Sequence, residues 1–136
     1  MICMEKTIRM PIVLIDTNFL VDIFRFGIGM ERISETVGSK PKLVIVGQSI
    51  KELEKLNLMY AKLSLKYIDS ERISILDMPG SNADDAILSF LSEKVKKSEK
   101  RDVILATNDY RLRKKAKGMG VRVIYLRARK HLEISD

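Results

Sequence analysis

Two carboxylates in this sequence stand just after apolar runs. The aliphatic run Ile12–Ile15 ends at Asp16. Asp109 follows the similar run Val103–Ala106 after a Thr–Asn pair. Short unbroken runs of this kind are typical of strands buried on both faces of a sheet. Both acids are therefore expected at the carboxyl ends of buried strands, where open α/β sheets place their functional sites.

Three further acids lie where helices are expected to begin. Glu52 falls in the first turn of a helix that follows the apolar run Lys42–Val46, and the neighbours Asp84 and Asp85 open a helix expected over Asp84–Lys97. In a parallel sheet, the carboxyl ends of the strands and the starts of the following helices share one edge. These acids are therefore expected to converge with those at the strand ends.

A cluster of four carboxylates favours a metal site. Two carboxylates about 4 Å apart repel by about 4 kcal/mol at an effective dielectric near 20, more than the roughly 0.3–1 kcal/mol that an acid gains at a helix N-terminus. A cation removes this repulsion, and an all-oxygen donor set selects Mg²⁺ or Mn²⁺ over zinc. The alternative is that each acid only caps a helix. Ser49–Glu52 matches a capping box, and Asn82 with Asp85 gives a similar cap.

The elements that must position these acids alternate between strands and helices. Apolar runs predict five strands, at Ile12–Ile15, Lys42–Val46, Ile73–Leu76, Val103–Ala106 and Val121–Leu126. Amphipathic or capped segments between them predict helices. This alternation indicates a three-layer α/β/α fold with a central parallel five-stranded sheet. The length of 136 residues indicates one domain, residues 1–136, with a short lead at 1–10 and a basic end at 127–136.

Composition excludes several function classes. His131 is the one histidine and Cys3 the one cysteine, so Ser–His or Cys–His catalysis and cysteine zinc clusters have no support. Neither a GxxxxGK[ST] loop nor a complete GxGxxG motif occurs. No apolar run approaches the roughly 18 residues that span a bilayer, and no signal-peptide pattern is present. No membrane association and a cytoplasmic location are expected.

The net charge of +7 is unevenly distributed. Residues 90–130 contain fourteen Lys and Arg against four acidic residues, a net charge of +10, so the rest of the chain carries −3. A basic segment of this kind suits a polyanion such as a phosphate backbone. The alternative is that lysine-rich helix faces are simply solvated.

Four segments together resemble the PIN-domain ribonuclease family. They read IDTN, SIKELEKL, NADDAIL and ILATNDYRLRKKAKGMGVRVIYLR, in that order between Ile12 and Leu132. The sequence is most similar to the archaeal and eukaryotic rRNA-processing branch and to VapC-type toxins. The resemblance implies a sheet in the order 3-2-1-4-5 and dependence on Mg²⁺ or Mn²⁺.

The resemblance also implies which residues form the site. The metal-binding and catalytic acids map onto Asp16, Glu52, Asp85 and Asp109. Asp85 is preferred to Asp84 because the family acid precedes one small and two apolar residues, here Ala86, Ile87 and Leu88. Polar residues that would support these acids are Asn18, Thr107, Asn108 and Asp84. Apart from the resemblance, the basic segment supplies the cations that would hold the RNA backbone, which are Arg111, Arg113, Lys114, Lys115 and Lys117. Tyr110 is a candidate for stacking on a base, with packing as the alternative.

The sequence thus predicts a metal-dependent ribonuclease, with an endonuclease favoured and rRNA processing as its role. The alternatives are a VapC-type toxin and a non-catalytic RNA-binding or assembly protein, although RNA binding gains nothing from uncompensated acids. A phosphate-accepting signalling domain fits least, because Asp16 stands without an adjacent acid. The partners compatible with this prediction are RNA such as an rRNA precursor, an antitoxin, a ribosome-assembly factor and a second copy in a homodimer.

Overall fold

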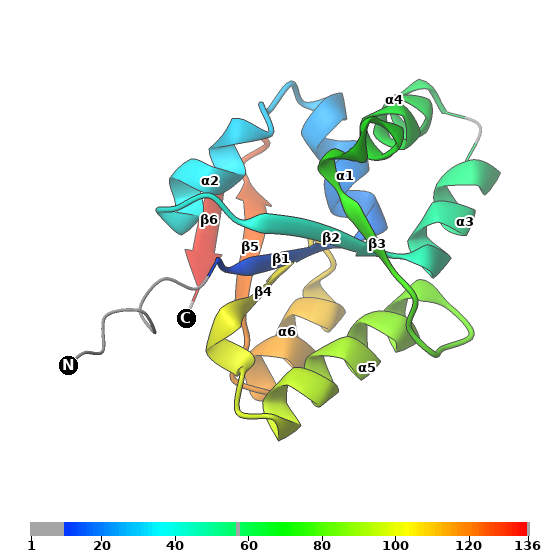
Figure 1. Ribbon diagram of the computed structural model, residues 1–136. Coiled ribbons are helices and arrows are strands. Elements are labelled where there is room, and N and C mark those ends of the chain that lie inside the picture. The colour runs from blue at the N-terminus through cyan, green and yellow to red at the C-terminus, as the bar shows by residue number, and fades with distance from the viewer. Residues whose placement is uncertain (1–9, 57, 136) are drawn as a thin grey trace.

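The computed structural model describes residues 10–56 and 58–135, which form three layers with a sheet in the middle (Figure 1). The strands lie in the order β3-β2-β1-β4-β5-β6. Their bounds are Ile12–Ile15 (β1), Lys42–Val46 (β2), Ser74–Leu76 (β3), Val103–Ala106 (β4), Arg122–Arg127 (β5) and His131–Ser135 (β6). The α/β/α fold class predicted from the sequence is confirmed, and the order of the first five strands is the one that the resemblance implied.

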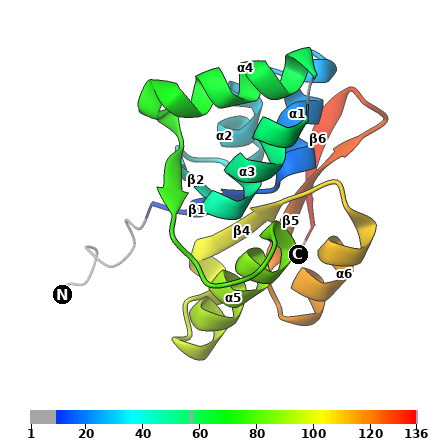
Figure 2. The same cartoon turned by 90° about the vertical axis from the view of Figure 1, so that its right-hand side faces the viewer.

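Helices cover both faces of the sheet. Figure 2 shows α1 to α4 on one side and α5 and α6 on the other. The bounds are Thr17–Arg25 (α1), Glu31–Val37 (α2), Gly47–Lys55 (α3), Met59–Tyr67 (α4), Ala83–Lys96 (α5) and Tyr110–Gly118 (α6). A π-helical turn, Ile68–Arg72, follows α4, and a 3₁₀ turn, Lys100–Asp102, precedes β4. Within the described residues, no helix combines the length and the apolarity needed to cross a bilayer.

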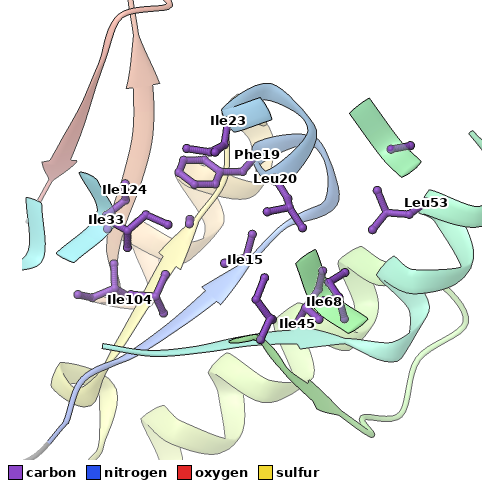
Figure 3. Packing of buried hydrophobic residues seen from close by; sticks show 14 residues of the cluster. Ile15, Phe19, Leu20, Ile23, Ile33, Ile45, Leu53, Ile68, Ile104 and Ile124 are labelled. Atoms are coloured by element: carbon purple, nitrogen blue, oxygen red, sulfur yellow. The ribbon is translucent and has the colours of Figure 1, made fainter. Parts of the chain in front are cut away.

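Alternate side chains along the strands supply two separate cores. Ile15 of β1 and Ile104 of β4 pack with Phe19 and Leu20 of α1 on one face (Figure 3). Leu14 and its counterparts on the neighbouring strands pack against α5 and α6 on the other face. Full burial of an aliphatic or aromatic side chain stabilises by about 1.5–3 kcal/mol. Burial on both faces explains why β1 reads as an unbroken apolar run.

The register between β1 and β4 places their ends level with each other. The two strands pair in parallel, and Ile15 lies opposite Ala106. The backbone N–H of Asp16 continues the ladder by donating to the carbonyl of Ala106 at 2.9 Å. Asp16 and Thr107 therefore leave neighbouring strands at the same edge of the sheet.

The sheet has one strand more than the five predicted from the sequence. β6 pairs antiparallel with β5 in a hairpin, so the sheet is mixed, and residues 131–135 of the predicted basic end form an edge strand. The hairpin turns at Ala128 and Arg129, whose φ angles are 56° and 58°. Three residues, 128–130, join the strands. A turn with positive φ at two successive residues favours Asn-Gly or Asp-Gly there, so Ala128 and Arg129 gave no recognisable signal. The predicted lead at residues 1–10 lies, apart from Met10, outside the described residues.

Candidate active site

Asp16 is the most buried acid of the predicted set, with 5% of its surface exposed. Its Oδ1 accepts a hydrogen bond from the backbone N–H of Thr17 at 2.8 Å, and its Oδ2 accepts one from the hydroxyl of Thr107 at 2.7 Å. Burial, with a smaller contribution from the charges of Asp84 and Glu52, raises the pKa of Asp16 to about 6 in spite of these bonds. The site therefore holds the Asp16 carboxylate in one orientation. A positive charge bound nearby would favour the ionised form of this group.

Glu52 joins Asp16 through Thr17. The hydroxyl of Thr17, in the first turn of α1, donates to Oε1 of Glu52 on α3 at 2.7 Å. Thr17 is itself buried, so this bond draws the exposed Glu52 side chain towards the end of β1. This role of Thr17 was missed by sequence reasoning. The signal that could have found it is a hydroxyl residue directly after the strand-end acid.

Asp109 caps the N-terminus of α6. Its Oδ1 accepts hydrogen bonds from the backbone N–H groups of Arg111 and Leu112 at 2.9 and 3.3 Å. Its own N–H donates to the hydroxyl oxygen of Thr107 at 3.1 Å. Thr107 therefore links the carboxylates at the ends of β1 and β4, because it also donates to Asp16.

On α5 the structure brings Asp84, not Asp85, to this edge. Burial is the main cause that raises the pKa of Asp84. The negative charges of nearby Asp109 and Glu52 raise this pKa as well. Asp85 lines a separate depression with Met78, and its Oδ2 accepts a hydrogen bond from the hydroxyl of Ser81 at 3.0 Å. The structure thus places Asp84, and not the preferred Asp85, beside the other acids. Neighbouring residues on a helix point about 100° apart, and the register of α5 turns Asp84 inward.

The acids line one pocket of about 440 Å³ at the carboxyl edge of the sheet. We call it the acidic pocket; the residues that line it are Asp16, Thr17, Asn18, Val21, Asp22, Glu52, Lys55, Leu56, Asp84 and Asp109. Asp22 is an acid that sequence reasoning missed. Because it stands four residues after Asn18 on the same helix face, that spacing was the signal that could have found it.

Asn108 has a structural role at the rim of the acidic pocket. Its Nδ2 donates to Oδ2 of Asp22 at 2.9 Å, and its Oδ1 accepts from the N–H of Leu126 at 2.8 Å. Asn108 therefore ties α1 to β5 and orients Asp22. The predicted supporting residue Asn18 is exposed and lines the acidic pocket.

Two lysines moderate the negative charge. Lys115 of α6 lowers the pKa of Asp84, against the larger opposing effects of burial and of Asp109. Lys55 of α3 lines the acidic pocket itself. The five predicted RNA-binding cations thus fall into different places. Lys115 faces the acids, Arg111 is exposed, and Arg113, Lys114 and Lys117 line a separate groove on the far side of α6.

The chemistry of the acidic pocket fits a hard divalent cation. Its potential ligands are carboxylate oxygens, the donors that Mg²⁺ and Mn²⁺ prefer. Among residues 10–56 and 58–135, however, no three Asp, Glu, His or Cys side chains stand in a geometry that would hold a metal ion. Asp16 is fixed, whereas Glu52 and Asp84 are exposed. The acids as they stand therefore do not form a ready-made coordination shell.

Comparisons with known proteins agree with this architecture. The family model described as a PIN like domain matches residues 13–129. Ribonuclease VapC4 of Methanocaldococcus jannaschii is 29% identical over 134 residues, which cover 88% of this chain and 92% of that protein. The solved structure of the PIN domain endonuclease Utp24 is similar with a TM-score of 0.78 and 23% identity, over 91% of this chain and 90% of the other. This last likeness concerns the fold.

Proposed function

Because this chain belongs to the PIN-like domain family, we propose that it is a metal-dependent ribonuclease. The observation that carries the proposal is Asp16, a buried carboxylate at a strand end with a hydrogen bond to each oxygen. Glu52, Asp84 and Asp109 line the same pocket. A surface that only binds RNA gains nothing from acids gathered in this way, since phosphates repel them.

We assign the metal ligands to Asp16, Asp109, Asp84 and Glu52, with Asp84 instead of the Asp85 that was preferred from the sequence. When bound, Mg²⁺ or Mn²⁺ would neutralise charge on the scissile phosphate and lower the pKa of a water. The chain itself fixes the positions of these groups. Thr107 and the N–H of Thr17 hold Asp16 in one orientation.

Other side chains of the acidic pocket act on the substrate without touching the reacting water. Lys55 lines the acidic pocket, and we assign to it contact with a phosphate oxygen of the substrate. Val21 and Leu56 form an apolar wall beside the acids. An apolar wall excludes water and strengthens the interactions between charges inside the pocket.

RNA is the substrate that we propose, and endonucleolytic cleavage is the reaction. The relative from Methanocaldococcus jannaschii is named a ribonuclease, and the structural relative is named an endonuclease. We favour rRNA processing as the role. A VapC-type toxin with an antitoxin partner is the second candidate, because Ribonuclease VapC4 aligns over 88% of this chain.

The proposal is tested by cleavage of an end-labelled RNA in Mn²⁺, in Mg²⁺ and in EDTA. We expect cleavage with either metal and none in EDTA. Equal cleavage in EDTA would contradict the metal dependence, and no cleavage under any condition would contradict the activity.

The adjacent acids of α5 give a matched pair of variants. Asp84→Asn is expected to lower cleavage by about 100-fold or more, as loss of a group that contacts the reacting centre does. Asp85→Asn makes the same chemical change one residue away, outside the acidic pocket, and is expected to keep most activity. If Asp85→Asn were the inactive variant, the assignment of ligands on α5 would be wrong.

A further inference from the structure

A second groove lies on the opposite side of α6 from the acidic pocket. It has a volume of about 400 Å³. We call it the α6–β5 groove; its lining residues are Tyr110, Arg113, Lys114, Lys117, Tyr125 and Ser135. The two sites are joined through the chain, because Tyr110 directly follows Asp109 of the acidic pocket. The two sites therefore meet at the start of α6, where Asp109 lines one and Tyr110 the other.

The helical part of the groove is one face of α6. Tyr110, Arg113, Lys114 and Lys117 have the i, i+3, i+4, i+7 spacing that places side chains on one side of a helix. The guanidinium carbon of Arg113 lies 4.2 Å from the ring centroid of Tyr125 and 5.5 Å from that of Tyr110. The ammonium of Lys114 lies 5.4 Å from the Tyr110 ring. The groove thus combines aromatic rings and cations within contact distance.

Tyr125 of β5 is held in place by a hydrogen bond to β6. Its hydroxyl donates a hydrogen bond to Oε1 of Glu133 on β6 at 3.0 Å. Arg127 also donates to both carboxylate oxygens of Glu133, at 3.1 and 3.2 Å. These bonds fix the ring on which Arg113 rests, so the guanidinium is held in place before any ligand arrives.

Tyr110, in contrast to the anchored Tyr125, is mostly exposed to solvent, with 61% of its surface accessible. Packing therefore does not account for this ring. Three cations on the same helix face also repel one another, and no acidic residue is among the residues that line the groove. A ligand with a flat aromatic group and negative charge would satisfy both features.

We infer that the α6–β5 groove binds an unpaired nucleotide of the RNA substrate, next to the phosphate that enters the acidic pocket. This inference rests on the proposed ribonuclease function. The base stacks on Tyr110, while Arg113, Lys114 and Lys117 contact the backbone phosphates. Bases in a duplex are already stacked and paired, so only single-stranded RNA can present a base to this ring.

The test is binding of a labelled single-stranded RNA and of the same sequence as a duplex, measured by fluorescence anisotropy in EDTA so that no cleavage occurs. Tyr110→Leu is expected to weaken single-strand binding roughly 5- to 100-fold, the effect of losing one base–aromatic stack, and to leave duplex binding nearly unchanged. Tyr110→Phe keeps the ring and is expected to bind as the parent does. Because Tyr110 is exposed, both variants are expected to keep the fold, which circular dichroism checks.

Salt dependence separates stacking from phosphate contacts. The logarithm of the affinity falls with the logarithm of the salt concentration, by about 0.7 for each phosphate contact to a single strand. Lys117→Ala is expected to reduce this slope by about 0.7. Tyr110→Leu is expected to leave the slope unchanged while it lowers the affinity.

Three results would overturn the groove assignment. They are parental single-strand affinity in Tyr110→Leu, an equal loss of duplex binding, and an equal loss of binding to heparin, which carries charge but no bases. Cleavage by the parent protein in Mn²⁺ is measured separately. A parent that binds RNA through Tyr110 but cleaves nothing would overturn the ribonuclease proposal alone. A parent that cleaves while Tyr110→Leu binds normally would overturn the groove alone.

Discussion

Replacing Asp16 by Asn is expected to stabilise the metal-free protein while abolishing cleavage. Burial, followed by the charges of Asp84 and Glu52, raises the pKa of Asp16 from its ordinary value of 3.8 to about 6. One pKa unit corresponds to about 1.4 kcal/mol. The ionised carboxylate therefore costs the folded state about 3 kcal/mol, a cost that a neutral amide avoids.

The sign follows from the pKa values of the two states. The folded protein binds the Asp16 proton more tightly than the unfolded chain does, so stability from this group is fully present below pH 3.8. It is lost as the pH rises from 3.8 towards about 6 and stays lost above that. The advantage of the Asn variant should therefore be present at pH 7.5 and largely absent near pH 4.

Part of the gain is offset by one hydrogen bond. The Asn oxygen can still accept from the N–H of Thr17, but its NH₂ group would face the hydroxyl that Thr107 now donates to Asp16. Losing one such bond costs about 1 kcal/mol. The net stabilisation is then about 2 kcal/mol, which raises the Tm of a domain of this size by about 6 °C.

The assay is thermal unfolding of the parent, Asp16→Asn and Asp85→Asn in EDTA at pH 7.5 and pH 4, and again in millimolar Mn²⁺. Asp85→Asn serves as the control because Asp85 lies outside the acidic pocket. With Mn²⁺ the order should reverse, since an ion at 100 times its Kd stabilises the parent by about 2.7 kcal/mol. An Asp16→Asn variant no more stable than the parent in EDTA at pH 7.5 would refute the reasoning.

Two further predictions concern residues that hold the acids in place. Thr17→Val removes the hydroxyl that donates to Glu52 at 2.7 Å; we expect cleavage to fall about tenfold while Thr17→Ser, which keeps the donor, stays near the parent rate, and equal rates for both would contradict the role. Asn108→Ala removes the bonds to Asp22 and to the N–H of Leu126. It should lower the free energy of unfolding by about 1–3 kcal/mol in urea denaturation, and an unchanged midpoint would contradict this.

The sequence was sufficient to predict the strands that carry the site. β1 and β4 have the predicted bounds, because burial on both faces requires an unbroken apolar run that few other structures share. Parallel pairing then brings Asp16 and Asp109 to one edge without further information. The hairpin to β6 was not predictable in the same way. Ala128 and Arg129 adopt φ angles that residues of their type seldom take, and the partner strand imposes them.

The choice between Asp84 and Asp85 shows where a local pattern stops being informative. The buried residues Ala83, Ala86 and Ile87 fix which side of α5 packs on the sheet. Asp84 stands three residues before Ile87 and therefore borders that side, whereas Asp85 lies about 100° further round the helix. The helical spacing thus favours Asp84, although the local pattern of one small and two apolar residues favoured Asp85. The neighbours of α5 agree with the spacing, because α5 contacts α3 and α6. Asp84 faces Glu52 and Lys115 on those helices, whereas Asp85 turns away from them. The placement of Asp84 beside these groups therefore follows from the packing of α3, α5 and α6.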